Sequence, residues 1–132
     1  MGYYIDTRYN DLRYIEINLD KKMPENLNRY LPLSEATAYI LMTLSEPLHG
    51  YGIMQKIEAL THGTVKVGPG TLYGALSTLE KQGLISMVDE KERRKIYHLT
   101  PKGEQVLTLH IERARAVVEN GQRILVAMKQ SA

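Results

Sequence analysis

The spacing of apolar residues predicts two short helices in the first half of the chain. Over residues 34–46 apolar side chains recur every three or four positions, Ser34 is a typical N-cap residue, and Pro47 stands just beyond the end. Over residues 51–61 apolar side chains repeat in the same way, and Gly63 suits a helix end. The turn-like sequence PLHG separates the two segments. We therefore expect a helix, a loop and a second helix.

A third helix is predicted from residue 68 to residue 83. Gly68 can act as its N-cap, the fixed φ of Pro69 suits the first helical position, and Gly83 marks its end. Its buried stripe is predicted to be Leu72, Ala75, Leu76 and Leu79. The face opposite this stripe carries less Glu and Lys than the surface of a solvated helix usually does. We therefore expect it to contact another molecule. The face consists of Thr71, Gly74, Ser77, Thr78 and Lys81, with Tyr73 at its side.

Two short apolar and β-branched segments, LISMV and KIYHL, then flank the charged turn DEKERR and predict a β-hairpin. The turn contains no Gly or Asn, so its geometry is not predicted. Thr100 and Pro101 start a long helix that runs to about Met128. Three helices followed by a hairpin is the order of a winged helix-turn-helix. We expect a mainly α fold with a minor β part and a long C-terminal dimerisation helix.

The long helix carries a heptad seam, because its apolar or small residues alternate at spacings of four and three. β-Branched Ile111 and Val118 occupy the a positions, a choice that favours two-stranded packing. A helix of this length would extend about 42 Å, longer than one small winged helix needs. The seam predicts a homodimer, and the alternative is a helix packed on its own domain. Its residues are Leu107, Ile111, Ala114, Val118, Gly121, Leu125 and Met128.

Composition and charge narrow the class of protein. The chain has 132 residues, 43% of them hydrophobic and 24% charged, as expected for one globular domain. No apolar run approaches the roughly 20 residues that span a bilayer, and no signal-peptide core is visible, so we expect a cytoplasmic protein without a membrane partner. The formal charge is only +2, but the sequence KERRK around Arg93 and Arg94 concentrates basic residues. Such a run is either a solvated turn or a nucleic-acid contact.

No catalytic or metal-binding pattern is present. The absence of cysteine excludes disulfides and thiolate zinc sites. The glycine-rich stretch before residue 74 lacks a phosphate-binding fingerprint, and Ser77 has no visible base partner. His49, His62, His98 and His110 lack metal-binding spacing and are expected to be surface or capping residues. We expect no enzyme activity, no cofactor and no metal.

Three blocks of sequence resemble the PadR family of bacterial transcriptional regulators. The blocks HGYGIMQKIE, VGPGTLYGALSTLEKQGLI and ERRKIYHLTPKGEQVL resemble successive family signatures in the same order, over about Leu33 to Leu109. The resemblance implies a regulator that binds double-stranded operator DNA, with Tyr51 near a phosphate and Thr71 and Tyr73 on the recognition helix. The full expected DNA-binding set is Tyr51, Lys66, Thr71, Tyr73, Ser77, Lys81, Arg93, Arg94 and Lys95.

Two departures from the family pattern concern the same surface. Gly74 stands where family members often have proline, and the hairpin is on the short side. A glycine inside a helix costs about 1 kcal/mol relative to alanine. Gly74 therefore either permits a close approach of DNA or relieves crowding against another helix.

The resemblance also implies partners other than DNA. The expected protein is a homodimeric repressor that a small apolar or phenolic effector releases from DNA, bound between the C-terminal and first helices. Small residues on the seam could leave space for it, and Tyr39 or an N-terminal tyrosine could stack on it. The alternative function is a winged-helix module that binds proteins and no DNA. The expected dimer-interface residues are Leu107, Ile111, Ala114, Val118 and Leu125.

Three regions are expected along the chain. Residues 33–99 form the winged helix-turn-helix DNA-binding domain and residues 100–132 the dimerisation helix. Residues 1–32 form an arm of unclear role that holds five of the nine tyrosines and the alternating sequence YIEINL. The arm could pack on the dimer, add a strand or be a non-native leader.

Overall fold

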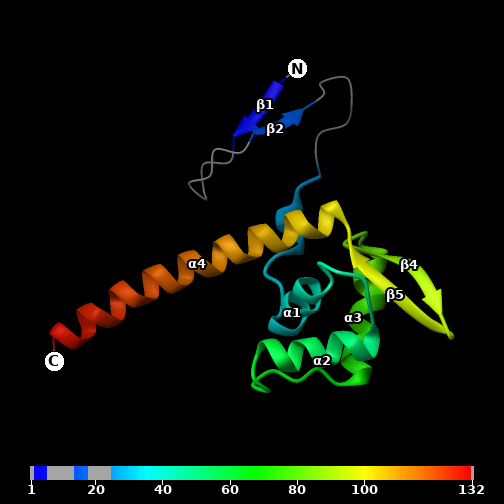
Figure 1. Ribbon diagram of the computed structural model, residues 1–132. Coiled ribbons are helices and arrows are strands. Elements are labelled where there is room, and N and C mark those ends of the chain that lie inside the picture. Colours follow the sequence, from blue (N-terminus) through cyan, green and yellow to red (C-terminus); the bar gives the residue numbers. More distant parts are fainter. Residues whose placement is uncertain (1, 6–13, 18–24, 132) are drawn as a thin grey trace.

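The structure is a computed structural model that describes residues 2–5, 14–17 and 25–131 (Figure 1). Near the N-terminus, β1 (Gly2–Ile5) and β2 (Tyr14–Ile17) pair with each other as antiparallel strands. The rest of the predicted arm up to residue 24 lies outside the described residues. The regions expected from the sequence remain a prediction.

A winged helix-turn-helix with a long C-terminal helix follows, as predicted (Figure 1). The sheet has the order β3-β5-β4, and both of its ladders are antiparallel. One hydrophobic core lies between the three short helices, the sheet and the start of the long helix. The mainly α fold with a minor β part is therefore confirmed. In chain order the elements are η2 (Leu27–Tyr30), α1 (Glu35–Thr43), β3 (Leu48–His49), α2 (Gly50–Leu60), α3 (Pro69–Lys81), β4 (Ile85–Lys91), β5 (Arg94–Leu99) and α4 (Pro101–Gln130).

The segment between α1 and α2 differs from the prediction. The Ser34 side chain caps α1 as expected by accepting a hydrogen bond from the backbone N–H of Thr37 at 3.1 Å, but α1 ends at Thr43 instead of residue 46. The predicted loop contains the short strand β3, in which Leu48 pairs with Tyr97. His49 then caps α2, because its Nδ1 accepts from the N–H of Gly52 at 3.2 Å. A strand of two residues is too short to show the alternation of apolar and polar residues from which strands are predicted.

Helix α3 has the predicted ends. Gly68 is the N-cap and Pro69 is the first helical residue. Past the end, Gly83 adopts a φ of +75°, a left-handed conformation that favours glycine, and the N–H of Leu84 returns to the carbonyl of Leu79 at 3.0 Å. Within the predicted apolar stripe, Leu72, Leu76 and Leu79 are buried and Ala75 is half-buried.

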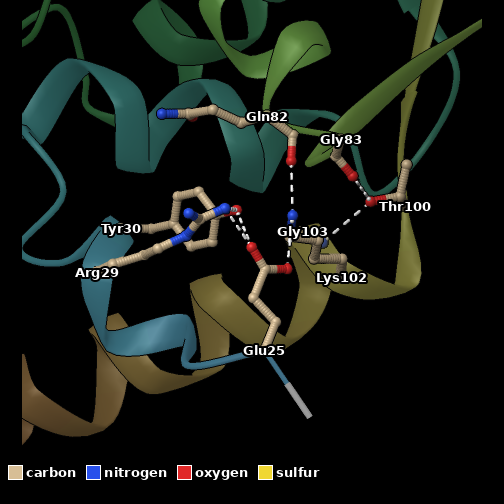
Figure 2. Close-up of polar contacts among 8 residues, drawn as sticks. All are labelled: Glu25, Arg29, Tyr30, Gln82, Gly83, Thr100, Lys102 and Gly103. Atoms are coloured by element: carbon tan, nitrogen blue, oxygen red, sulfur yellow. Dashed lines mark hydrogen bonds and ion pairs between the residues drawn. The ribbon is translucent and has the colours of Figure 1, made fainter. Parts of the chain in front are cut away.

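A glycine allows the base of α4 to lie directly against the backbone of the core. A Cβ atom added to Gly103 would lie 2.0 Å from the carbonyl oxygen of Leu84, so only glycine fits this approach of helix to backbone. The Thr100 side chain reinforces the junction, because its hydroxyl donates to the Gly83 carbonyl at 2.7 Å and accepts from the N–H of Gly103 at 3.0 Å (Figure 2). These contacts fix where α4 leaves the winged helix.

Beyond its base, α4 projects away from the rest of the fold (Figure 1). Its 30 residues extend about 45 Å. Its buried residues are Gly103 and Val106, in the first two turns, and every residue from Ala114 to Gln130 except half-buried Gly121 is exposed. Within the single chain, the alternative of a helix packed along its length on its own domain is wrong.

Candidate nucleic-acid interface

The polar face of α3 is open to solvent. All of its predicted members, together with Tyr73, are exposed, whereas the opposite face enters the core. This separation follows from the helical repeat, because residues three or four apart share a face. The N-terminus of α2 and the hairpin lie next to this part of α3.

A groove of about 660 Å³ lies between α3 and the hairpin. It brings together six of the nine predicted DNA-binding residues from three elements. Lys66, Thr71 and Lys81 are also exposed but do not line it. The six that do are Tyr51, Tyr73, Ser77, Arg93, Arg94 and Lys95.

Tyr73 crosses from α3 to the start of α2. A Cβ atom added to Gly50 would lie 2.8 Å from the Tyr73 hydroxyl oxygen, so the absence of a side chain at Gly50 makes room for the phenol. The Tyr73 side chain nevertheless remains 57% exposed, and that of Tyr51 is 59% exposed. Both tyrosines therefore line the groove and remain open to solvent.

The tip of the hairpin has a turn that the sequence did not predict. Lys91 pairs with Arg94 across the strands, which leaves Glu92 and Arg93 as a two-residue turn with φ values of 51° and 66°. Positive φ at both positions is characteristic of type I′ turns, which favour Asn and Gly. A side chain in this conformation costs roughly 1–2 kcal/mol relative to glycine. The turn thus holds the Arg93 guanidinium at the groove, although glycine would adopt the backbone conformation of this position at a lower cost.

Comparison with known proteins assigns the fold to a family. Residues 39–109 match the transcriptional regulator PadR-like family, a span that includes α2, α3 and the hairpin. The chain belongs to this family. The groove is therefore the surface between helix and wing of a PadR-like regulator.

Two curated relatives and one solved structure agree with this membership. The chain is 34% identical over 92 residues to transcriptional regulator YqjI of Escherichia coli K12, which covers 69% of this chain and 44% of that protein. It is 36% identical over 89 residues to transcriptional regulator Rv3488 of Mycobacterium tuberculosis, covering 64% and 77% respectively. A transcriptional regulator from Clostridium thermocellum matches with a TM-score of 0.61 at 27% identity, over 67% of this chain and 87% of that one. This PadR-like chain spans less than half of the E. coli protein.

One acidic residue of the groove was missed by the sequence reasoning. Glu80 lines the groove and is exposed, and no ion pair of the described residues involves it. Burial raises the pKa of the neighbouring Tyr97, and the negative charge of Glu80 adds to that increase. The spacing from Tyr73 to Ser77 to Glu80 is four and then three residues, which is the signal that could have placed Glu80 on this face.

Gly74 has open space around it. A Cβ atom added there would meet no other atom within 4 Å, and the residue is exposed on α3. The Thr78 hydroxyl donates to the Gly74 carbonyl at 3.1 Å. Relief of crowding against another helix of the same chain is therefore the wrong explanation for this glycine.

The described residues of this PadR-like protein offer no metal centre. No group of three His, Asp or Glu side chains among them could hold an ion. His49 is the capping residue already described, and Nδ1 of His110 accepts from the backbone N–H of Leu33 at 3.3 Å.

The family and the two named relatives are transcriptional regulators rather than enzymes. In the described part of the chain, no helix combines the length and apolarity needed to cross a membrane.

Proposed function

We propose that this protein is a homodimeric transcriptional repressor that binds a specific double-stranded DNA operator. The observation that carries the proposal is the groove, which combines the uncharged polar face of α3 with the guanidinium and ammonium groups of the hairpin. A B-DNA major groove about 12 Å wide admits a helix of this size. With α3 in that groove, the hairpin tip lies against the phosphate backbone.

The roles of the residues follow from their chemistry and position. Thr71, Tyr73 and Ser77 present hydroxyl groups that both donate and accept, so they can bond to base edges or to phosphates. Exposed Gly74 lets the backbone of α3 approach the DNA closely. Lys66 and Lys81 lie before and at the end of α3, where they reach the flanking backbone. Tyr51, at the start of α2, lines the same groove and contacts a phosphate there. Arg93, Arg94 and Lys95 neutralise phosphates at the hairpin.

The projecting part of α4 supports a dimer. Its apolar side chains are exposed in the single chain, including Val118 at 55% and Leu125 at 58%. A helix that leaves a continuous apolar stripe in water is stabilised by a partner that covers it. Pairing through Leu107, Ile111, Ala114, Val118 and Leu125 places two recognition helices on a two-fold axis. The operator is then a near-palindrome with half-sites about one helical turn apart, or a multiple of it.

Release by an effector is the regulatory part of the proposal. A small apolar or phenolic compound would bind between α4 and α1 near the two-fold axis, beside half-buried Tyr39. Ala114 and Gly121 are the small residues of the seam, which could leave space between the two subunits. A compound shifts operator affinity only by its differential affinity for the DNA-competent and DNA-incompetent dimers. Phenolic compounds should weaken operator binding, and Ala114→Trp, which fills the space, should abolish their effect.

The decisive experiment is a titration of promoter DNA at several salt concentrations. We expect tight binding to one sequence, with affinity falling steeply as salt rises because phosphate contacts release counterions. Unrelated DNA should bind far more weakly, by a factor on the order of 10³ or more. Equal affinity for all sequences, or no binding at low salt, would refute the proposal.

A second candidate is supported by two apolar residues of the hairpin. Met87 and Val88 on β4 are 45% and 52% exposed and do not line the groove. A winged-helix module that binds a protein partner would use such side chains. Their replacement by Ser would leave DNA affinity unchanged if DNA is the ligand, and would remove binding if a protein partner occupies this strand.

A further inference from the structure

The residues that precede α1 lie along α4, and Lys102 in the first turn of α4 joins them to the end of α3. We call residues 25–33 the brace. Its apolar side chains Leu27, Tyr30, Leu31 and Leu33 pack against the core, which anchors the segment to the winged helix. Its polar groups contact α4 at two places, and these contacts are the basis of the inference.

The first set of polar contacts joins the brace to the junction of α3 and α4 (Figure 2). Lys102 in the first turn of α4 lies between two acceptors, with its Nζ 2.8 Å from Oε2 of Glu25 and 2.8 Å from the carbonyl oxygen of Gln82. Gln82 is the C-cap of α3, so one ammonium group contacts the brace and the end of the recognition helix together. The Lys102 Nζ also lies 4.8 Å from the centroid of the Tyr30 ring.

Glu25 is held by more than one donor. The Tyr30 hydroxyl donates to its Oε1 at 2.6 Å, and Arg29 forms an ion pair with the same oxygen (Figure 2). The hydrogen bond from Lys102, followed by that from Tyr30, lowers the pKa of Glu25 to about 2. An isolated exposed ion pair contributes little. Here several donors converge on one carboxylate, which favours a single arrangement of the junction.

The second set of contacts lies further along α4. Arg113 donates to Oδ1 of Asn28 at 2.7 Å, and the N–H of Leu33 donates to His110 at 3.3 Å. From Lys102 to Arg113 the helix rises about 17 Å. The brace therefore contacts α4 at both ends of this stretch, and between these ends Val106 and Leu107 pack against the core.

We infer that the brace fixes the direction of α4 relative to α3, and that it thereby sets the separation of the two recognition helices in the dimer. The second half of this inference rests on the proposed function. Beyond Arg113, α4 continues for about 26 Å to Gln130. A tilt of roughly 10° at the brace moves that end by about 4.5 Å. One base-pair step is about 3.4 Å, so such a tilt changes which half-site spacing fits.

The claim that the brace fixes the direction of α4 is tested without DNA, by measuring the distance between two spin labels. The native chain contains no cysteine, so spin labels attach only where cysteine is introduced. Gln55→Cys on α2 and Arg123→Cys on the outer face of α4 report the direction of α4, with labelled chains diluted into unlabelled ones so that distances within one chain dominate. Glu25→Ala and, separately, Lys102→Met remove the junction contacts. The matched control is Glu46→Ala, which removes another exposed ion pair, the 2.7 Å contact with Lys56.

We expect one narrow distance distribution for the parent and for Glu46→Ala, and a distribution at least about twice as wide for both brace variants. Circular dichroism will establish that each variant is folded. A brace variant that is folded and keeps the parent distribution overturns the inference.

The claim that the brace sets the separation of the recognition helices is tested with operators whose half-sites are moved apart by one base pair. The parent should lose affinity on the altered spacing, and Glu25→Ala should lose much less, while both bind a single half-site equally. An unchanged spacing preference in Glu25→Ala overturns the link to DNA. A parent without any sequence-specific binding refutes the proposed function instead, and the distance measurement still decides the role of the brace.

Discussion

The hydroxyl of Tyr73 occupies the space that a side chain at Gly50 would fill, with an added Cβ only 2.8 Å from the Tyr73 oxygen. Gly50→Ala should therefore displace the phenol. The cost to folding should be small, because the displaced group is the free end of a side chain and alanine is about 1 kcal/mol better than glycine in a helix. We expect an unchanged or slightly higher melting temperature and operator binding weakened several-fold.

Gly52→Ala is the matched control for this change. A Cβ there would lie 3.4 Å from Leu48 Cδ2, a contact that needs little adjustment, and it would not reach Tyr73. Its operator affinity should equal that of the parent. If Gly50→Ala also binds operator as the parent does, the position of Tyr73 does not matter for DNA binding.

Arg93→Gly should separate stability from DNA binding. Glycine relieves the positive φ of 66°, so the hairpin should gain about 1 kcal/mol, while the loss of one phosphate contact should weaken all DNA binding and reduce the salt slope by about 1. Thermal melts and titrations at several salt concentrations measure the two effects.

Glu92→Gly is the control, because it relieves the other positive φ and removes a negative charge. It should be stabilised in the same way without loss of DNA affinity. Equal weakening in both variants would mean that the shape of the turn, and not the Arg93 guanidinium, contacts DNA.

The helices and the hairpin were predictable because each has a local signal. Gly68 and Pro69 specify the start of α3, and the apolar repeat specifies its buried face. Strand β3 was missed because its two residues are fixed by pairing with β5 across the chain. The geometry of the hairpin turn was missed because Glu92 and Arg93 adopt a conformation for which neither has a preference.

The candidate site was predictable only in part for a related reason. Position on α3 and local charge indicated most of its residues, but Glu80 resembles any solvated glutamate until the groove is seen. The brace depends on contacts between residues far apart in sequence, such as Glu25 with Lys102. Such a pair leaves no periodic pattern in the amino-acid sequence.

Val118→Asp should convert the proposed dimer to monomers. The side chain is 55% exposed in the single chain, so the substitution should leave the monomer fold intact. In a dimer, the two carboxylates would meet across the seam, where burial of unpaired charge is strongly unfavourable. Analytical ultracentrifugation should give the monomer mass, and tight operator binding should be lost. Ala116→Asp, on the outer face of α4, should stay dimeric. A dimer mass for Val118→Asp would show that α4 pairs through another surface.

Gly103→Ala should destabilise the whole domain. The added Cβ would lie 2.0 Å from the Leu84 carbonyl oxygen, which is backbone and cannot rotate away, so α4 has to shift at its base. We expect a loss of about 3 kcal/mol in the free energy of unfolding, measured by urea denaturation. Gly70→Ala, where an added Cβ meets no atom within 4 Å, should unfold at the same or a higher urea concentration. A Gly103→Ala protein of parental stability would mean that the base of α4 yields easily.

Glu80→Gln should reduce the specificity of DNA binding. Glu80 faces the same groove as Arg93 and Arg94, so its carboxylate repels any phosphate that those side chains attract. This repulsion should disfavour random DNA most, because base contacts hold the phosphates of a seated operator in one position, whereas random DNA shifts and brings phosphates closer to Glu80. We expect non-specific affinity to rise by about 2- to 5-fold, operator affinity to rise less, and the ratio between them to fall. Glu58→Gln on α2 makes the same change in net charge outside the groove and is the control. If both variants gain non-specific affinity equally, the effect comes from net charge and Glu80 has no special role.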